Sequence, residues 1–133
     1  MNFPIYRLAD SDLLIVKLLM DNKFEFKMIL DTGATNTTID SSALYLFGYD
    51  IKNSIGITEI ETGNGIIESE IFEIKTISSL GIVKNNFHVQ VYDFLSHGIL
   101  SDYDGLLGLD FLKGMKFCID MNADYISINR SEL

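Results

Sequence analysis

The alternation of apolar and polar residues predicts β-strands from the start of the chain. Residues 12–20 (DLLIVKLLM) and 23–30 (KFEFKMIL) are rich in β-forming side chains. They flank Asp21-Asn22-Lys23, a sequence typical of a tight turn. We therefore expect a hairpin over this region.

The same pattern continues through the rest of the chain. Further strands are predicted at residues 54–61, 65–74, 83–94, 116–121 and 124–130. The first two are joined by Thr62-Gly63-Asn64-Gly65, which has strong turn chemistry. The last two are joined through Asn122-Ala123. Both pairs are expected to form hairpins.

Helical signal is confined to two short segments. Residues 40–48 offer Asp40 or Ser41 as an N-cap and Gly48 as a C-terminal stop. Residues 109–114 can form one or two turns. The pattern therefore predicts an all-β fold with one or two short helices. A length of 133 residues is typical of a single domain, which we place over residues 1–133.

Composition and charge exclude several kinds of protein. Apolar residues make up 47% of the chain, enough for a core, and the net charge of −9 argues against a nucleic-acid partner. Cys118 is the only cysteine, so no intrachain disulfide can form. With His88 and His97 as the only histidines, a thiolate-rich zinc site is excluded. Cys118 itself is expected to be a small buried hydrophobe.

The N-terminal sequence does not resemble a secretory leader. Asp10 and Asp12 precede its short apolar stretch and Lys17 interrupts it. No segment approaches the roughly 20 apolar residues of a membrane span. We expect a soluble, cytoplasmic protein without a membrane partner.

The predicted strand that ends at Leu30 is followed by Asp31-Thr32-Gly33. A carboxylate at the end of an apolar strand has no packing role, but it can be presented to a substrate. Gly33 permits a turn that a β-carbon would prevent, and the small Ala34 would let a substrate backbone approach. The alternative is that Asp31 caps the turn.

A second motif is DGLLGLDFLKG, residues 104–114. Leu106 and Leu107 can run as a strand beside the Asp31 turn. Gly108 would then leave space where the chain passes behind that turn.

Taken in order, ILDTGAT, TGNG and GLLGLDFL resemble the retropepsin-like aspartic proteases, single-lobed relatives of pepsin. The similarity runs from about residue 12 to about residue 128. It implies a closed, mostly β barrel, an active homodimer, an extended peptide substrate, and neither a metal nor an organic cofactor.

In this chemistry two carboxylates share one proton, because two like charges about 3 Å apart cannot both ionise. The chain has one Asp-Thr-Gly, so two copies would each supply Asp31 around a two-fold axis. The resemblance implies that Thr32 bonds the partner's loop and that Gly33 and Ala34 support the site. It assigns the substrate-binding flap to Thr62, Gly63, Asn64 and Gly65, and a structural motif to Leu106, Leu107 and Gly108.

Several residues depart from the retroviral pattern. Leu109 and Asp110 stand where an arginine and a polar residue are usual, so the arginine's ion pair is absent. Thr35 and Asn36 replace an acidic pair, and pocket preference cannot be transferred. Asp102, Asp104 and Asp110 are expected to be solvated or capping, although Asp110 is the first candidate for a second carboxylate from the same chain.

Two alternative hypotheses for the function remain open. The chain could be a non-catalytic dimerising or peptide-binding module with idle carboxylates. It could also be a small-ligand-binding barrel, whose mark would be an enclosed apolar cavity.

Overall fold

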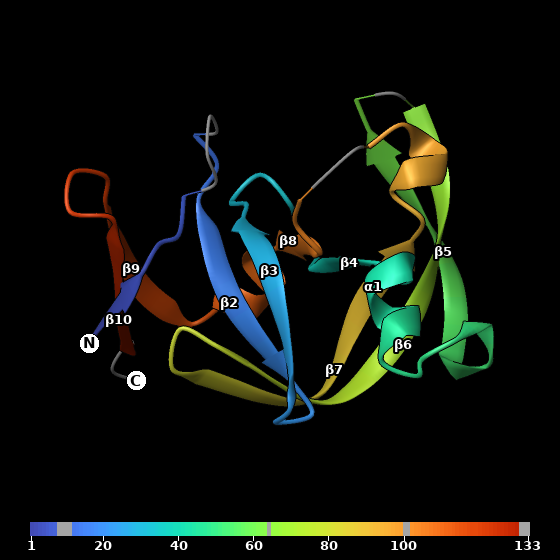
Figure 1. The fold of residues 1–133 in the computed structure, drawn as a ribbon, viewed down its shortest axis with the longest axis horizontal. Helices are drawn as coiled ribbons and strands as arrows, with labels where there is room; N and C mark the ends of the chain where they lie inside the picture. Colours follow the sequence, from blue (N-terminus) through green and yellow to red (C-terminus); the bar gives the residue numbers. More distant parts are fainter. Residues whose placement is uncertain (8–11, 64, 100–101, 131–133) are drawn as a thin grey trace.

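The computed structural model describes residues 1–7, 12–63, 65–99 and 102–130, and these form ten strands and two α-helices (Figure 1). The strands are β1 (Asn2–Pro4), β2 (Ile15–Met20), β3 (Phe24–Leu30), β4 (Thr38–Asp40), β5 (Ser54–Thr62), β6 (Gly65–Ser79), β7 (Ile82–Tyr92), β8 (Gly105–Leu107), β9 (Met115–Asp120) and β10 (Tyr125–Arg130). The helices are α1 (Ser41–Leu46) and α2 (Leu109–Leu112), with 3-10 turns η1 (Ile51–Asn53) and η2 (Leu95–His97). Within the described ranges no helix is both long enough and apolar enough to cross a bilayer.

Six strands close into a barrel in the order β2-β3-β8-β4-β7-β6. The ring is completed because β2 also pairs with β6, with Leu19 opposite Ser78 and Met20 opposite Ile77. β5 continues the sheet beyond β6 and projects from the barrel as a hairpin with it (Figure 1). The expected closed, all-β, retropepsin-like barrel with two short helices is confirmed.

The barrel interior is filled by large apolar side chains. Phe26, Phe72 and Phe111 are each at most 1% exposed. Burying one such side chain contributes about 1.5–3 kcal/mol. The interior is therefore a packed core, and the open space lies outside the barrel wall.

The predicted hairpins and the first helix form as expected. Asp21 and Asn22 have φ angles of 53° and 59° and form the left-handed centre of a tight turn, which the Lys23 N–H closes by donating to the Met20 carbonyl at 3.1 Å. Asp40 caps α1 by accepting a hydrogen bond from the Ser42 N–H at 3.4 Å. Gly48 follows the helix with a φ of 93°.

Other boundaries differ from the prediction. β2 begins at Ile15 and not at residue 12, and β6 runs five residues past the predicted end to Ser79. β6 is longer because it pairs with β5 and β7 and then also with β2. The short strands β1 and β4 were not predicted, since three residues give no readable alternation.

A separate three-stranded sheet, in the order β1-β10-β9, brings the two ends of the chain together (Figure 1). The expectation that Cys118 is buried was wrong, because its side chain is exposed. In β9 the half-buried Phe117 and Ile119 alternate with Cys118, which therefore projects to the opposite, solvent side.

Candidate active site

Asp31 lies directly after β3, where that strand runs parallel to β8. Leu30 is opposite Leu107, and the Asp31 N–H donates to the Leu107 carbonyl at 3.0 Å. The last backbone bond of the strand pair therefore fixes the residue that carries the carboxylate. The Asp31 side chain is half-buried.

The segment after Asp31, residues 31–37, is called here the Asp31 loop. Its first turn is closed by the Ala34 N–H, which donates to the Asp31 carbonyl at 3.1 Å. The Gly33 N–H donates to Asp31 Oδ1 at 2.9 Å and so orients the carboxylate. A β-carbon at Gly33 would lie 3.1 Å from Asp31 Oδ1, so any larger residue would crowd this oxygen.

The start of α2 is bound to the back of the Asp31 loop. The N–H groups of Leu109 and Asp110 donate to the carbonyls of Ala34 and Thr35 at 2.9 and 3.1 Å. A β-carbon at Gly108 would lie 2.8 Å from the Ala34 carbonyl oxygen. Gly108 therefore lies, as predicted, where the chain passes behind the Asp31 turn, and the two segments cross there too closely for a side chain.

Thr37 is a residue that sequence reasoning missed. It is fully buried, and its N–H and hydroxyl both donate to the Asp110 carboxylate, the hydroxyl at 2.7 Å to Oδ1. This contact anchors α2 to the Asp31 loop, in place of the arginine ion pair expected from the retroviral pattern. The only signal in the sequence was an acidic residue in the first turn of a short helix.

A cleft of about 620 Å³ lies between the Asp31 loop and the hairpin of β5 and β6. One wall is the Asp31 loop, with Asp31, Gly33, Ala34, Thr35 and Asn36. The other wall is the β5 arm from Glu59 to Gly63. The floor, which is the barrel surface between them, consists of Thr38, Gln90, Tyr92 and Leu106.

The residues assigned to a flap lie at the tip of this hairpin, as far as they are described. Thr62 and Gly63 line the cleft, and the Thr62 hydroxyl donates to the Gly65 carbonyl at 2.9 Å. Gly65 opens β6 with a φ of 113°, a conformation that favours glycine. Asn64 lies outside the described residues.

The other predicted residues divide between cleft and core. Leu106 lines the cleft, and Leu107 is fully buried in the barrel. None of Asp102, Asp104 and Asp110 lines the cleft. Asp104 instead accepts a hydrogen bond from the Lys27 N–H at 2.8 Å, and Asp110 is held by Thr37. These three aspartates therefore do not supply a second carboxylate beside Asp31.

Tyr103 is a further neighbour of Asp31 that the sequence did not reveal. Burial, and secondly the Asp31 charge, raise the pKa of the Tyr103 phenol. Burial also raises the pKa of Tyr92, with smaller contributions from Tyr103 and Asp40. Both phenols therefore keep their protons at neutral pH.

Metal-ligating side chains do not converge in the part of the chain that the structure describes. No group of three His, Cys, Asp or Glu residues there could hold an ion. The expectation that the protein works without metal or cofactor stays a prediction.

Comparisons with known proteins agree with this geometry. The family model described as "gag-polyprotein putative aspartyl protease" matches residues 16–114. No curated protein matches the chain. The fold is similar to the crystal structure of a retropepsin-like aspartic protease from Rickettsia conorii, with a TM-score of 0.65 and 22% sequence identity over 96% of this chain and 90% of that chain. Because the family model spans most of the 133 residues, the chain belongs to the aspartyl protease family of gag polyproteins, and its fold is retropepsin-like.

Proposed function

We propose that the protein is an aspartic endopeptidase, active as a homodimer, that uses Asp31 from each of two copies to cleave an extended peptide. One observation carries the proposal. The Asp31 carboxylate opens into a cleft at the end of β3, oriented by the Gly33 N–H at 2.9 Å. The family membership supports the hydrolase class.

The need for a second copy follows from the chemistry. An aspartic protease needs a second carboxylate close enough to share a proton with the first. The other acidic residues that border the cleft are Glu59 and Glu61 on the β5 arm, at the opposite wall from Asp31. A two-fold axis beside Asp31 would provide the missing group from an identical chain.

In the proposed reaction, one carboxylate of the pair is ionised and the other is protonated. The ionised carboxylate takes a proton from water while the water oxygen attacks the peptide carbonyl carbon. The protonated carboxyl gives its proton to the carbonyl oxygen. When the tetrahedral gem-diol collapses, the carboxyl that took the proton from water gives it to the nitrogen, the carbon–nitrogen bond breaks, and the other carboxylate takes back one hydroxyl proton, so the products are a carboxylic acid and an amine. The pair ends with one shared proton, as it began.

The exposed Thr32 is suited to contact a second copy. It lies next to Asp31 at the tip of the tight turn, where its side chain is open to solvent in one chain. Across a two-fold axis its hydroxyl could bond the partner's Asp31 loop and hold the two carboxylates close. The hairpin tip at Thr62 and Gly63 would close over the bound peptide and exclude water.

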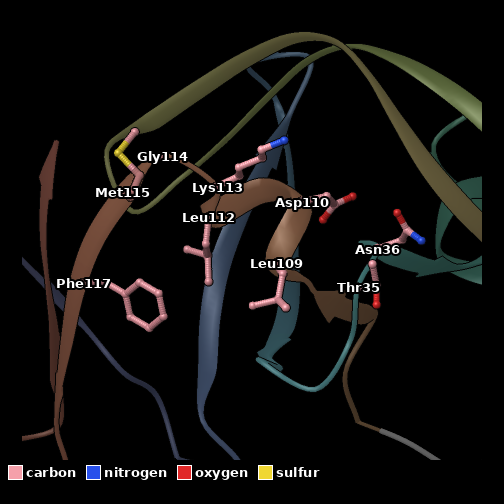
Figure 2. A pocket seen from close by; sticks show the side chains of 9 residues that line it. All are labelled: Thr35, Asn36, Leu109, Asp110, Leu112, Lys113, Gly114, Met115 and Phe117. Atoms are coloured by element: carbon pink, nitrogen blue, oxygen red, sulfur yellow. The ribbon is translucent and has the colours of Figure 1, made fainter. Parts of the chain in front are cut away.

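Two features beside the Asp31 loop suggest where the second copy docks. The first is β9, which pairs only with β10 in the described chain and so presents an unpaired edge of six residues. The second is an open groove of about 500 Å³ between α2 and β9. Figure 2 shows Leu109, Leu112 and Phe117 converging on this groove. Thr35 and Asn36 line both the groove and the cleft, so a protomer that covers Asp31 would also reach the groove.

The test compares wild type with Asp31→Asn on a diverse peptide library at several pH values. We expect cleavage by wild type and none by Asp31→Asn, with the fold and the dimer retained. The matched control is Asp21→Asn, because Asp21 also accepts hydrogen bonds, from the Tyr49 hydroxyl and the Thr76 N–H, but lies in the turn before β3. Asp21→Asn should keep full cleavage. Undiminished cleavage by Asp31→Asn would remove this carboxylate from the mechanism.

The same experiment separates the proposal from its main rival. A stable dimer that binds peptides but cleaves none at any pH would be the result expected of a non-catalytic module. Sedimentation of the same samples reports the oligomeric state independently of cleavage.

A further inference from the structure

The floor of the cleft has a composition that sets it apart from the barrel core. Thr38 of β4 is the Cα partner of Gln90 in β7 and of Leu106 in β8. Paired residues on neighbouring strands project from the same face of a sheet. Thr38, Gln90 and Leu106 therefore form one continuous patch, and all three line the cleft.

Alternation along β7 fixes the direction of Gln90. Val89 and Val91 are each 1% exposed and belong to the barrel core. Gln90 and Tyr92 project to the other side, into the cleft, and are half-buried. Because the Gln90 N–H donates to the Thr37 carbonyl at 3.0 Å, the backbone beneath this side chain is held against the Asp31 loop.

Polar groups on this floor and on the adjoining wall have unused hydrogen-bonding capacity. The side-chain amides of Gln90 and Asn36 make no hydrogen bond to the described part of the chain, although both residues line the cleft. The Thr38 hydroxyl donates to the Asn36 carbonyl at 3.3 Å and keeps its acceptor capacity. The two amides and the hydroxyl together offer donors and acceptors toward a bound substrate.

We propose that this floor selects substrates that place an uncharged polar side chain, an amide above all, beside the scissile bond. The inference rests on the proposed function, since it concerns the specificity of that same cleft. A leucine bound there would cover the half-buried Gln90 amide and the exposed Asn36 amide without bonding them, which costs the desolvation of each group. A substrate amide would instead supply both a donor and an acceptor for hydrogen bonds with Gln90 and Asn36. A site that hydrogen-bonds its substrate in this way strongly rejects an apolar analogue, because the polar groups of the site are then left unpaired.

The charges around the floor favour a neutral group over an acidic one. Asp31 lies in the same cleft, and no lysine or arginine is among the residues that line it. Glu59 and Glu61 alternate with Ile60 and Thr62 along β5 and are exposed. The charged groups that an acidic substrate side chain would meet in this cleft are therefore all negative.

The test uses peptides that differ at one position, carrying glutamine, asparagine, threonine, leucine or lysine at each of the positions nearest the scissile bond. At one position we expect wild-type kcat/KM for glutamine or asparagine to exceed that for leucine by about tenfold or more. Gln90→Leu, which keeps similar bulk, should abolish or invert this preference. Asn85→Leu is the matched control, because Asn85 is an exposed amide on the same strand but outside the cleft, and it should leave the preference unchanged.

Affinity measurements keep this inference separate from the catalytic proposal. If wild type cleaves no peptide, the proposed function fails, and the same peptides are then titrated into Asp31→Asn to compare Kd values. A tenfold tighter Kd for the amide peptide, lost in Gln90→Leu, would still support a polar floor. The inference is overturned by a preference for leucine or lysine at every position, by an unchanged preference in Gln90→Leu, or by a cleft that binds none of the peptides.

Discussion

Thr37 and Asp110 join the Asp31 loop to α2 through three hydrogen bonds. The Thr37 N–H donates to the two carboxylate oxygens of Asp110 at 2.9 and 3.0 Å, and its hydroxyl donates to Oδ1 at 2.7 Å. The hydroxyl oxygen also accepts the Gly108 N–H at 3.1 Å. One buried threonine thus satisfies a carboxylate 73 residues away and a backbone donor 71 residues away in the sequence.

We expect Thr37→Val to lower the free energy of unfolding by about 1–3 kcal/mol, since it leaves the buried Gly108 N–H without an acceptor and removes a bond from Asp110. Thr37→Ser should recover most of this loss, because the hydroxyl is restored. Urea denaturation measures both. Thr35→Val is the control, since Thr35 is exposed, and an equal loss in that variant would contradict the argument.

Gly108→Ala is expected to destabilise the protein by about 1–3 kcal/mol through overpacking. The new methyl group would lie 2.8 Å from the Ala34 carbonyl oxygen and 2.8 Å from the Asn36 carbonyl carbon, both of which are backbone atoms that cannot rotate away. Gly63→Ala should change stability by less than about 0.5 kcal/mol, because nothing lies within 4 Å of a β-carbon there. Thermal unfolding of the two variants side by side checks the difference, and equal melting temperatures would refute it.

The sequence predicted those features that depend on local pattern. β-forming composition and alternation predicted β3, the hairpin of β5 and β6, and β7. The run from Asp104 to Leu112 predicted β8 and α2. Gly108 was predicted to leave space behind the Asp31 turn, and the backbone of Ala34 and Asn36 does pass within 3 Å of where its β-carbon would be.

Features that depend on distant pairing could not be read from the chain. Thr37 and Gln90 look like ordinary polar residues until β4 is placed between β7 and β8. Cys118 was assigned to the wrong side because its exposure depends on which face of β9 packs against the barrel. Alternation gives the period of a strand but does not say which of its two faces becomes buried.

Tyr49 should make stability depend on alkaline pH. Burial, and then its hydrogen bond to Asp21, raise the pKa of Tyr49 from 10.0 to about 12. Between pH 10 and 12 the unfolded chain loses this phenolic proton while the folded chain keeps it, so the free energy of unfolding falls as pH rises through this window. Urea denaturation at pH 9 and pH 11 should show a larger loss for wild type than for Tyr49→Phe. Identical losses would show that the Tyr49 phenol is not responsible.

The net charge of −9 on each protomer predicts that dimerisation depends on ionic strength and pH. Two acidic chains repel each other when they meet, and salt screens this repulsion, because the Debye length falls from about 10 Å at 0.1 M to about 3 Å at 1 M. We expect the dimer to tighten with added salt or with mild acid, which neutralises part of the carboxylates. Sedimentation at two ionic strengths measures the change in the dissociation constant of the dimer. The comparison variant is Leu109→Asp, which adds a negative charge in the groove between α2 and β9. Weakening of the dimer by Leu109→Asp would support docking at this groove, whereas a dimer equally tight at both ionic strengths would show that charge does not control association.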